Sequence, residues 1–364
     1  MSKRKLRRQS DADYLLGVIE GFYGRTWSWP LRRAVIEFLQ QQQCNAYVYA
    51  PKADRYLRRE WRQTYPAAEF EELLALREHC RAHRIQFGLG FSPWGLQVSY
   101  SESDRVALTE RFAQLNRLDA DVLCILFDDM PGAVDDLARR QAAIVGDIMT
   151  ASSARRFVVC PTYYSFDPVL EEVFGAMPAR YLETLAELLP RAVDMFWTGP
   201  QVMSTGYTAE DMAAITARIG RKPLLWDNYP VNDGRRSSRF LNLLPVRRRP
   251  PQLRQWCRGH LANPMNQPLL SLLPLASLAQ NYRDEHYSPD QFWRERLEQF
   301  IDADLAALLR RDAKRFQAEG LDALSADQRQ ALIAEYAQVA HPAAAEVIDW
   351  LREGYRFDPD CLTS

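Results

Sequence analysis

Short runs of β-branched and aromatic residues alternate with longer stretches of helical periodicity through most of this chain. The intervening segments, such as PLRRAVIEFLQQQQ with Pro30 at a first-turn position, carry apolar residues at helical spacing. Alternating strands and helices build parallel sheets, and eight such units in about 280 residues are typical of a TIM barrel. The sequence therefore predicts an α/β fold, a (β/α)8 TIM barrel. Its strand-like runs are YLLGVIE, NAYVYA, IQFGLGF, DVLCILF, RFVVCPT, VDMFWTG, PLLWDN and the weaker RGHLANP.

The pattern changes near residue 287. From Tyr287 onward strand-like runs are absent, and stretches such as FWRERLEQFIDADLAALLRRDAKRF repeat apolar residues at helical spacing. We therefore expect a barrel over residues 14–286 and a C-terminal helical region over residues 287–364. That region either caps the barrel, packs on its outer wall or pairs with another subunit as a homodimer. Residues 1–13 are basic and show neither pattern, so we expect a disordered tail there.

Composition argues against several classes of partner. Lysine and arginine total 46 against 47 acidic residues, so bulk charge does not favour nucleic acid. No stretch approaches the roughly 20 apolar residues of a membrane span, and the basic start leads into no signal-peptide core. The cysteines show no CxxC spacing, and Cys124 and Cys160 lie in strand-like runs. We predict a cytoplasmic protein with reduced thiols and with no membrane or nucleic-acid partner.

Polar and aromatic side chains follow most of the predicted strands. In a TIM barrel the functional groups lie at the carboxyl ends of the strands, so these residues are expected to meet on one face. Carboxylates, amides, one lysine and several aromatic rings are typical of a sugar site, where polar groups bind hydroxyls and rings cover apolar faces. The strand ends carry Glu20–Arg25, Pro51–Lys52, Asp128–Asp129, Thr162–Tyr164, Trp197–Pro200, Trp226–Asn228 and Asn263–Pro264.

The end of the fourth predicted strand, CILFDDMPGAV, places two carboxylates side by side. Side chains alternate along a strand, so Asp128 and Asp129 reach one pocket only if the backbone turns, which Pro131 and Gly132 favour. Two carboxylates in a partly dry site do not both ionise readily, so one is expected to keep its proton, as glycoside hydrolysis requires. The motif alone equally allows one aspartate to cap the next helix and the other to face solvent.

Seven sequence blocks, spread over nearly the whole predicted barrel, resemble those of one enzyme family. They are GVIEGFYGRTW (17–27), AYVYAPKAD (46–54), LFDDMPG (126–132), CPTYY (160–164), FWTGPQV (196–202), LWDNYPVND (225–233) and LANP (261–264). On these blocks the chain resembles glycoside hydrolase family 84, the O-GlcNAcases and related bacterial β-N-acetylglucosaminidases. The resemblance implies a retaining enzyme that removes β-linked GlcNAc and uses the 2-acetamido group of the substrate as the nucleophile.

By the same resemblance, the two aspartates divide the chemistry. Asp128 would stay anionic and hold the acetamido N–H, while Asp129 would protonate the leaving oxygen and then act as a base on water. The hydroxyls of the sugar would be held by Gly21 and Lys52 near position 3, and by Asp233 and Asn263 at positions 4 and 6.

The remaining implied residues support the acetamido group and shape the pocket. Asn228 would orient Asp128, and Tyr164 would lie near the acetamido carbonyl. The pocket wall would comprise Tyr23, Cys160, Val202 and Trp226, although Cys160 is expected to be more structural than functional. The resemblance implies no cofactor and no metal.

Some features depart from the family or lie outside its motifs. Tyr163 stands where many members carry Glu, and the tract Gly234–Arg239 either contacts an acidic aglycone or faces solvent. His79 and His83 are spaced i, i+4 on a predicted helix, but with no third ligand in the sequence pattern we expect an exposed helix face. The preferred substrate is a GlcNAc-modified protein. The alternatives are an exo-hexosaminidase for small GlcNAc glycans and a non-catalytic GlcNAc-binding protein.

Overall fold

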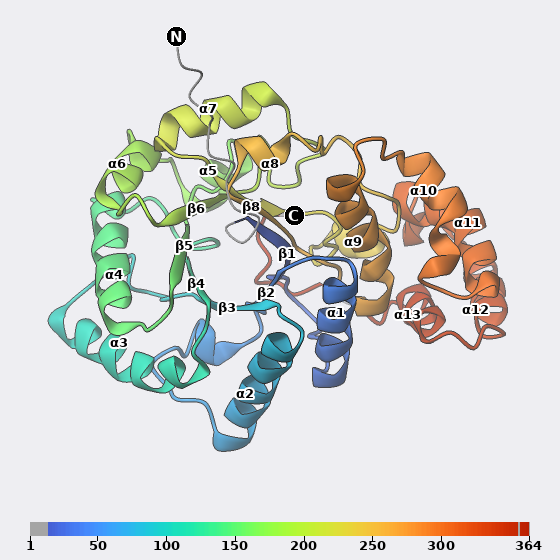
Figure 1. Ribbon diagram of the computed structural model, residues 1–364, viewed down its shortest axis with the longest axis horizontal. Helices are drawn as coiled ribbons and strands as arrows, with labels where there is room; N and C mark the ends of the chain where they lie inside the picture. Colours follow the sequence, from blue (N-terminus) through green and yellow to red (C-terminus); the bar gives the residue numbers. More distant parts are fainter. Residues whose placement is uncertain (1–13, 356, 364) are drawn as a thin grey trace, which may run out of the picture.

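Eight parallel strands close into a barrel in sequence order, which confirms the predicted (β/α)8 TIM barrel (Figure 1). The computed structural model describes residues 14–355 and 357–363, so the expected tail at residues 1–13 lies outside the described residues. The last strand pairs with the first, with Leu15 opposite Gly259. The strands are β1 (Leu15–Glu20), β2 (Ala46–Tyr49), β3 (Gln86–Phe91), β4 (Val122–Leu126), β5 (Arg156–Cys160), β6 (Asp194–Trp197), β7 (Leu224–Asp227) and β8 (Gly259–Ala262).

Helices surround the barrel and bury apolar residues against the strands. Helix α1 has Pro in its first turn, as the sequence predicts, and it buries Val35, Ile36 and Leu39. The helices of the barrel are α1 (Trp29–Gln41), α2 (Ala67–Ala82), α3 (Glu102–Leu115), α4 (Leu137–Ala151), α5 (Val169–Phe174), α6 (Tyr181–Leu188), α7 (Ala209–Ile219), α8 (Leu253–Trp256) and α9 (Pro268–Arg283). Among the described residues, none of these or the later helices combines the length and apolar character that a membrane span requires.

The strands of the barrel lie so close together that one position excludes any side chain. A Cβ atom added to Gly17 on β1 would stand 1.8 Å from the carbonyl oxygen of Ala46, its partner on β2. Every residue of β1 is buried, because the strand faces the barrel interior on one side and the helices on the other. This tight interior gives the loops at the carboxyl ends of the strands a rigid base.

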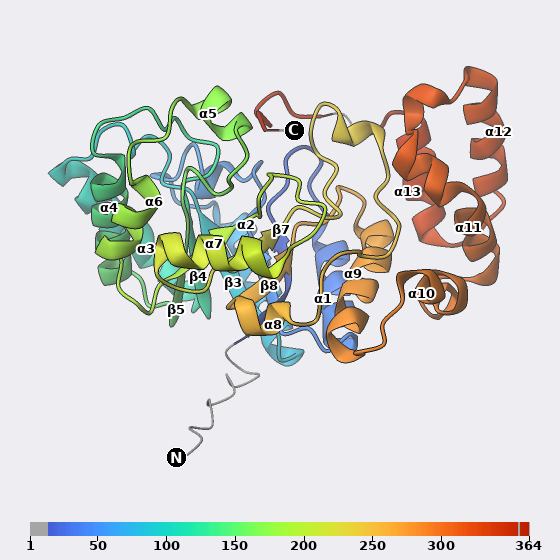
Figure 2. The same cartoon turned by 90° about the horizontal axis from the view of Figure 1, so that it is seen from above.

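The helices after the barrel pack on its outer wall (Figure 2), which is one of the arrangements that the sequence left open for this region. They are α10 (Pro289–Glu295), α11 (Ala303–Ala318), α12 (Ala326–Tyr336) and α13 (Pro342–Leu351). Their apolar side chains form a second core, in which Phe316 and Trp350 pack with Leu241 and Leu270 of the barrel part. The carboxylate of Glu346 on α13 accepts hydrogen bonds from the backbone N–H groups of Leu269 and Leu270, at 3.0 and 2.8 Å, and so caps α9.

Candidate active site

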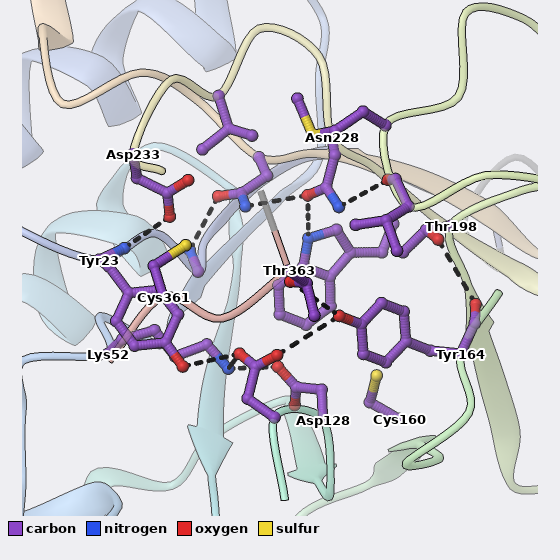
Figure 3. A pocket seen from close by; sticks show the side chains of 17 residues that line it. Tyr23, Lys52, Asp128, Cys160, Tyr164, Thr198, Asn228, Asp233, Cys361 and Thr363 are labelled. Carbon is purple, nitrogen blue, oxygen red and sulfur yellow. Dashed lines mark hydrogen bonds and ion pairs between the residues drawn. The ribbon is translucent and has the colours of Figure 1, made fainter. Parts of the chain in front are cut away.

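A pocket lies at the carboxyl ends of the strands, and every residue that the sequence analysis assigned to the site lines it (Figure 3). The same pocket is also lined by residues that were not assigned to it. Of these, Thr198 and Val231 lie inside the quoted sequence blocks, so their neighbours had already marked the region. Met203 follows directly after the FWTGPQV block, whereas Cys361 and Thr363 come from the far end of the chain. No sequence motif connects these last two residues with the site.

The backbone turns sharply at the carboxylate pair, so that both aspartates reach the pocket. Strand β4 ends at Leu126, and Asp129 has a positive φ of 59°. This left-handed conformation is uncommon outside glycine, though aspartate tolerates it better than most residues, and it breaks the alternation of a strand. Both Asp128 and Asp129 are 6% exposed and line the same pocket. The turn required by the sequence argument is therefore present.

Lys52, at the end of β2, is the cation that binds the pair. Its ammonium donates a hydrogen bond to Oδ2 of Asp128 and lies 3.7 Å from Oδ2 of Asp129. Burial would lower the pKa of Lys52, but the charges of Asp128 and Asp129 outweigh burial and raise it. Burial raises the pKa of Asp128; Lys52 opposes that shift, whereas Asp129 adds to it. One cation therefore serves two close carboxylates, which leaves the site able to stabilise further positive charge.

Two tyrosine hydroxyls reach the second aspartate. Tyr23 donates to Oδ2 of Asp129 at 2.7 Å, and Tyr164 donates to Oδ1 at 3.3 Å. Burial, with the charge of Asp129 as the next cause, raises the pKa of both tyrosines well above the usual range. Both hydroxyls therefore stay neutral and act as donors at neutral pH. Arg58 donates to the Tyr23 hydroxyl at 3.0 Å and holds that ring in place.

Asparagine side chains tie the opposite side of the pocket together. Oδ1 of Asn228 accepts from the indole N–H of Trp226 at 3.0 Å and from Asn263 at 3.1 Å. Its amide nitrogen donates to the carbonyl of Val202 at 3.0 Å, and Oδ1 of Asn263 accepts from the Gly21 N–H at 3.2 Å. The described hydrogen bonds of Asn228 thus go to residues of the pocket wall. The resemblance implied that Asn228 would orient Asp128. In this structure Lys52 is the residue that binds Asp128.

Two further groups complete the interior. Asp233 accepts a hydrogen bond from the Tyr23 N–H at 2.8 Å, and burial raises the pKa of its carboxyl to about 6. The thiol of Cys160 lies near Asp128, and burial raises the pKa of that thiol well above its usual range. A neutral buried thiol is a poor nucleophile, which agrees with the structural role expected for Cys160.

Two strand-end carboxylates do not join the pocket. Glu20 is fully buried and forms an ion pair with Arg32 at 2.7 Å. Asp227 is also fully buried and pairs with Arg249 at 2.8 Å and with His260 at 2.9 Å. Both groups were counted among the strand-end residues expected on the functional face. They instead hold elements of the scaffold together, because their side chains turn away from the pocket.

The arginine-containing tract Gly234–Arg239 near the pocket mouth is engaged with other parts of the protein. Arg239 forms ion pairs with Asp322 at 2.6 Å and with Glu353 at 2.9 Å, and so fastens this loop to the helical region. The guanidinium of Arg235 lies 5.0 Å from the ring centre of Phe357. Arg239 is thereby engaged within the protein, whereas Arg235 and Arg236 are exposed, so contact with an acidic aglycone and exposure to solvent both stay predictions for this tract.

Three comparisons place the chain among known proteins. A family model described as beta-N-acetylglucosaminidase matches residues 16–313. The protein O-GlcNAcases of Rattus norvegicus and Mus musculus are each 31% identical to the chain over 280 residues. Those matches cover 74% of this chain and 30% of the relatives, so the chain spans about a third of their length.

A solved structure of a mutant Thermobaculum terrenum O-GlcNAc hydrolase has the same fold. It aligns with a TM-score of 0.75 at 29% identity and covers 93% of this chain and 74% of its own. The family match includes the strand ends that form the pocket, from Gly21 to Asn263. The chain belongs to the β-N-acetylglucosaminidase family of glycoside hydrolases, family 84, as the sequence blocks indicated.

Proposed function

We propose that this protein is a retaining exo-β-N-acetylglucosaminidase that removes GlcNAc from Ser or Thr of modified proteins by substrate-assisted catalysis. The observation that carries the proposal is the state of Asp128. Its Oδ2 is held by Lys52, while its Oδ1 is buried with no hydrogen-bond partner among the described residues. A buried acceptor without a partner calls for an explanation, and the N–H of a 2-acetamido group supplies one.

The first chemical step follows from this arrangement. Asp128 accepts the acetamido N–H and directs the acetamido oxygen at the anomeric carbon, where a C–O bond forms as the glycosidic bond breaks. Asp129 gives its proton to the departing hydroxyl oxygen. The positive charge of the oxazoline intermediate is stabilised by Asp128, which makes one ion pair with Lys52 rather than several.

The second step reverses these roles. Asp129, now a carboxylate, takes a proton from water as the water oxygen attacks the anomeric carbon and the ring of the oxazoline opens. Two attacks on opposite faces retain the configuration of the sugar. Tyr23 and Tyr164 donate to Asp129 and stabilise its ionised form in this step.

The remaining pocket residues suit the binding of GlcNAc hydroxyls and of the acetamido methyl. Asp233 and Asn263 offer acceptors and an amide for positions 4 and 6, and Gly21 and Lys52 line the region assigned to position 3. Trp226 and Cys160 provide apolar surface beside the carboxylates. The related rat and mouse proteins are named protein O-GlcNAcases, which favours a protein-linked substrate over a small glycan.

We also propose a cytoplasmic location, a GlcNAc-bearing protein as the partner and a homodimer through α10–α13. The buried thiols of Cys124 and Cys160, which are in no disulfide, support a reducing compartment. Light scattering with chromatography tests the dimer, and a mass of one chain at micromolar concentration would rule it out.

The test of function is hydrolysis of an aryl β-N-acetylglucosaminide beside the matching β-glucoside. We expect turnover of the GlcNAc substrate alone, and Asp128→Asn should lower kcat by roughly 100-fold or more, as loss of a transition-state electrostatic partner does. Successive fluorination of the N-acetyl group should slow the wild type steeply, because fluorine weakens the acetamido oxygen as a nucleophile. A rate indifferent to fluorine would contradict substrate assistance. A folded protein that binds GlcNAc without turnover would favour the binding-protein alternative.

A further inference from the structure

The segment 357–363, called the tail segment below, enters the pocket from the far end of the chain. Cys361 and Thr363 line the pocket together with Asp128 and Asp129 (Figure 3). The Thr363 hydroxyl lies 3.3 Å from the hydroxyl of Tyr164, which itself donates to Asp129. The hydroxyl of Tyr164 therefore lies between the Thr363 side chain and Asp129, the proposed acid and base.

Charged and aromatic contacts hold this segment on the rim of the pocket. The carboxylate of Asp360 lies 2.8 Å from the guanidinium of Arg59 and 3.7 Å from that of Arg58. The ring of Phe357 lies against the guanidinium of Arg235, at 5.0 Å. Arg58 is only 4% exposed and also donates to Tyr23, so the rim contact connects directly to the pocket wall.

The tail segment leaves too little space for a sugar. With the segment in place, the cavity measures about 50 Å³. Sites for small organic ligands usually measure about 300–1,000 Å³. A GlcNAc residue placed against Asp128 and Asp129 would therefore compete with Cys361 and Thr363 for this space.

We propose that the tail segment is an internal ligand of the pocket, and that the rim formed by Arg58, Arg59 and Arg235 binds the peptide part of the substrate. The partner that this rim fits is an acidic peptide whose Ser or Thr carries the sugar. The carboxylate of Asp360 and the ring of Phe357 show which side chains the rim receives, on the N-terminal side of the residue in the pocket. This inference rests on the proposed function for its substrate, but the occupancy of the pocket can be tested without turnover.

The first test is Asp360→Asn, with Asp327→Asn on the exposed first turn of α12 as the matched control. Losing the ion pair should free the pocket, so KM for an aryl β-N-acetylglucosaminide falls roughly two- to five-fold with kcat unchanged, a change typical of an exposed pair. The control should behave as wild type. An unchanged KM in Asp360→Asn would contradict the proposal that the tail segment occupies the pocket as an internal ligand.

The second test uses synthetic peptides with the sequence of residues 357–363, with Ser replacing Cys361. The peptide should inhibit Asp360→Asn competitively, and its analogue with Asn in place of Asp360 should inhibit more weakly. GlcNAc-peptides with an aspartate three residues before the modified threonine should show higher kcat/KM than their asparagine counterparts. Equal inhibition by both peptides, or equal kcat/KM, would overturn the acidic preference.

A third readout separates failure of this inference from failure of the proposed function. Alkylation of Cys361, followed by mass spectrometry without any substrate, should be faster in Asp360→Asn than in wild type, because the tail segment leaves the pocket more often. Equal alkylation rates in the two proteins would contradict the proposal that the tail segment is an internal ligand, even if the enzyme is active. If alkylation is faster in Asp360→Asn but the protein shows no turnover, the internal ligand is supported and only the proposed catalytic function is rejected.

A separate observation concerns the histidine pair on α2. The third ligand that the sequence pattern lacked comes from α1: Oε1 of Glu37 lies 3.2 Å from Nε2 of His79. That contact does not have the geometry of a hydrogen bond, so the nitrogen makes no hydrogen bond among the described residues. Nδ1 of His83 contacts the carbonyl of His79 at 2.9 Å, which leaves its Nε2 for a ligand. Ligand atoms of the three side chains lie within 4.8 Å of one another.

We infer that Glu37, His79 and His83 form a Zn²⁺ site that joins α1 to α2 on the outer wall of the barrel, with water in the fourth position. Two imidazoles and one carboxylate are a usual donor set for zinc, and small side-chain rotations bring the ligand atoms to the separations of a tetrahedral site, about 3.3 Å. None of the three residues lines the pocket, so the ion would join two helices and take no part in the chemistry on the sugar.

Calorimetric titration with Zn²⁺ and the visible spectrum with Co²⁺ test the site. We expect one equivalent of Zn²⁺ and a tetrahedral Co²⁺ spectrum, with at least about ten-fold weaker binding in His79→Ala and His83→Ala. His286→Ala, at an exposed histidine elsewhere, is the control. Circular dichroism establishes that the variants fold. Equal Zn²⁺ affinity in all four proteins, or no saturable binding, would overturn the site.

Discussion

Asp128 and Asp227 lie at the same edge of one barrel, at the ends of β4 and β7, and both are buried, yet they are held in opposite ways. Asp227 has a partner for each oxygen: Arg249 binds both, at 2.8 Å, and His260 adds a contact at 2.9 Å. Asp128 has one partner, Lys52, and an oxygen left without any among the described residues.

The acid–base properties of the two aspartates follow from this difference. Burial would raise the pKa of Asp227, but Arg249 and then His260 outweigh burial and hold the pKa well below its usual range. Burial raises the pKa of Asp128, because Lys52 alone does not outweigh it while Asp129 lies beside it. A satisfied carboxylate stabilises the fold, whereas an incompletely satisfied one keeps a binding capacity for substrate.

The largest effect is expected at the acid and base. Asp129→Asn should lower kcat/KM by about 10²–10⁴-fold on substrates with poor leaving groups, the usual contribution of a general acid. Activated aryl glycosides should lose much less, because their leaving group needs little protonation. The free energy of unfolding should change little. Steady-state kinetics on a leaving-group series checks this, and equal losses across the series would count against Asp129 as the acid.

Breaking the other carboxylate cluster should act on stability instead. Arg249→Met leaves Asp227 buried without its main partner and should lower the free energy of unfolding by about 3–5 kcal/mol. Adding Asp227→Asn to that variant should restore part of the loss, since no charge then stays buried. Urea denaturation of the wild type, both single variants and the double variant measures the coupling. Additive losses would mean that the pair is not the source of the effect.

The pH dependence should separate pocket carboxylates from scaffold carboxylates. The pKa of Asp233 in the folded protein, about 6, lies above the unfolded value near 3.9, so its contribution to stability is full below about pH 4 and is lost as pH rises through 6. Asp233→Asn should therefore be more stable than wild type at pH 7, by up to about 3 kcal/mol, and no more stable at pH 4.

The contribution of the scaffold aspartate, Asp227, to stability changes with pH in the opposite direction. The pKa of Asp227 is held below its unfolded value, so its contribution is present above about pH 4 and is lost as pH falls further. Burial also raises the pKa of Glu346 to about 7, so the difference between wild type and Asp233→Asn is the quantity to measure. A difference that does not change between pH 4 and 7 would show that the pKa of Asp233 is not raised in the folded protein.

The smallest effect is expected where a neutral contact shapes the pocket. Trp226→Phe keeps an aromatic wall but removes the indole donor to Asn228, a hydrogen bond of about 0.5–1.5 kcal/mol net. KM for the GlcNAc substrate should rise roughly two- to ten-fold with kcat nearly constant. A large fall in kcat would instead place this ring among the groups that stabilise the transition state.

Most of the site was accessible from the sequence because parallel strands bring their carboxyl ends to one edge. Residues far apart in the chain, such as Gly21 and Asn263, each follow a strand, so the barrel topology alone places them together. The same rule failed for Glu20 and Asp227, which also end strands. Whether a strand-end side chain faces the pocket depends on the register and on a single backbone turn, and these depend on packing.

The sequence by itself determined the βα alternation, the order of the site blocks and the chemical nature of the pocket, because strand periodicity and strand ends are local properties. Only the tertiary structure decided the positive φ at Asp129, the partnership of Lys52 with Asp128, the closeness of Glu37 to His79 and the entry of Thr363 into the pocket. Each of these joins segments or conformations whose stability comes from packing across the whole chain. No window of sequence contains that information.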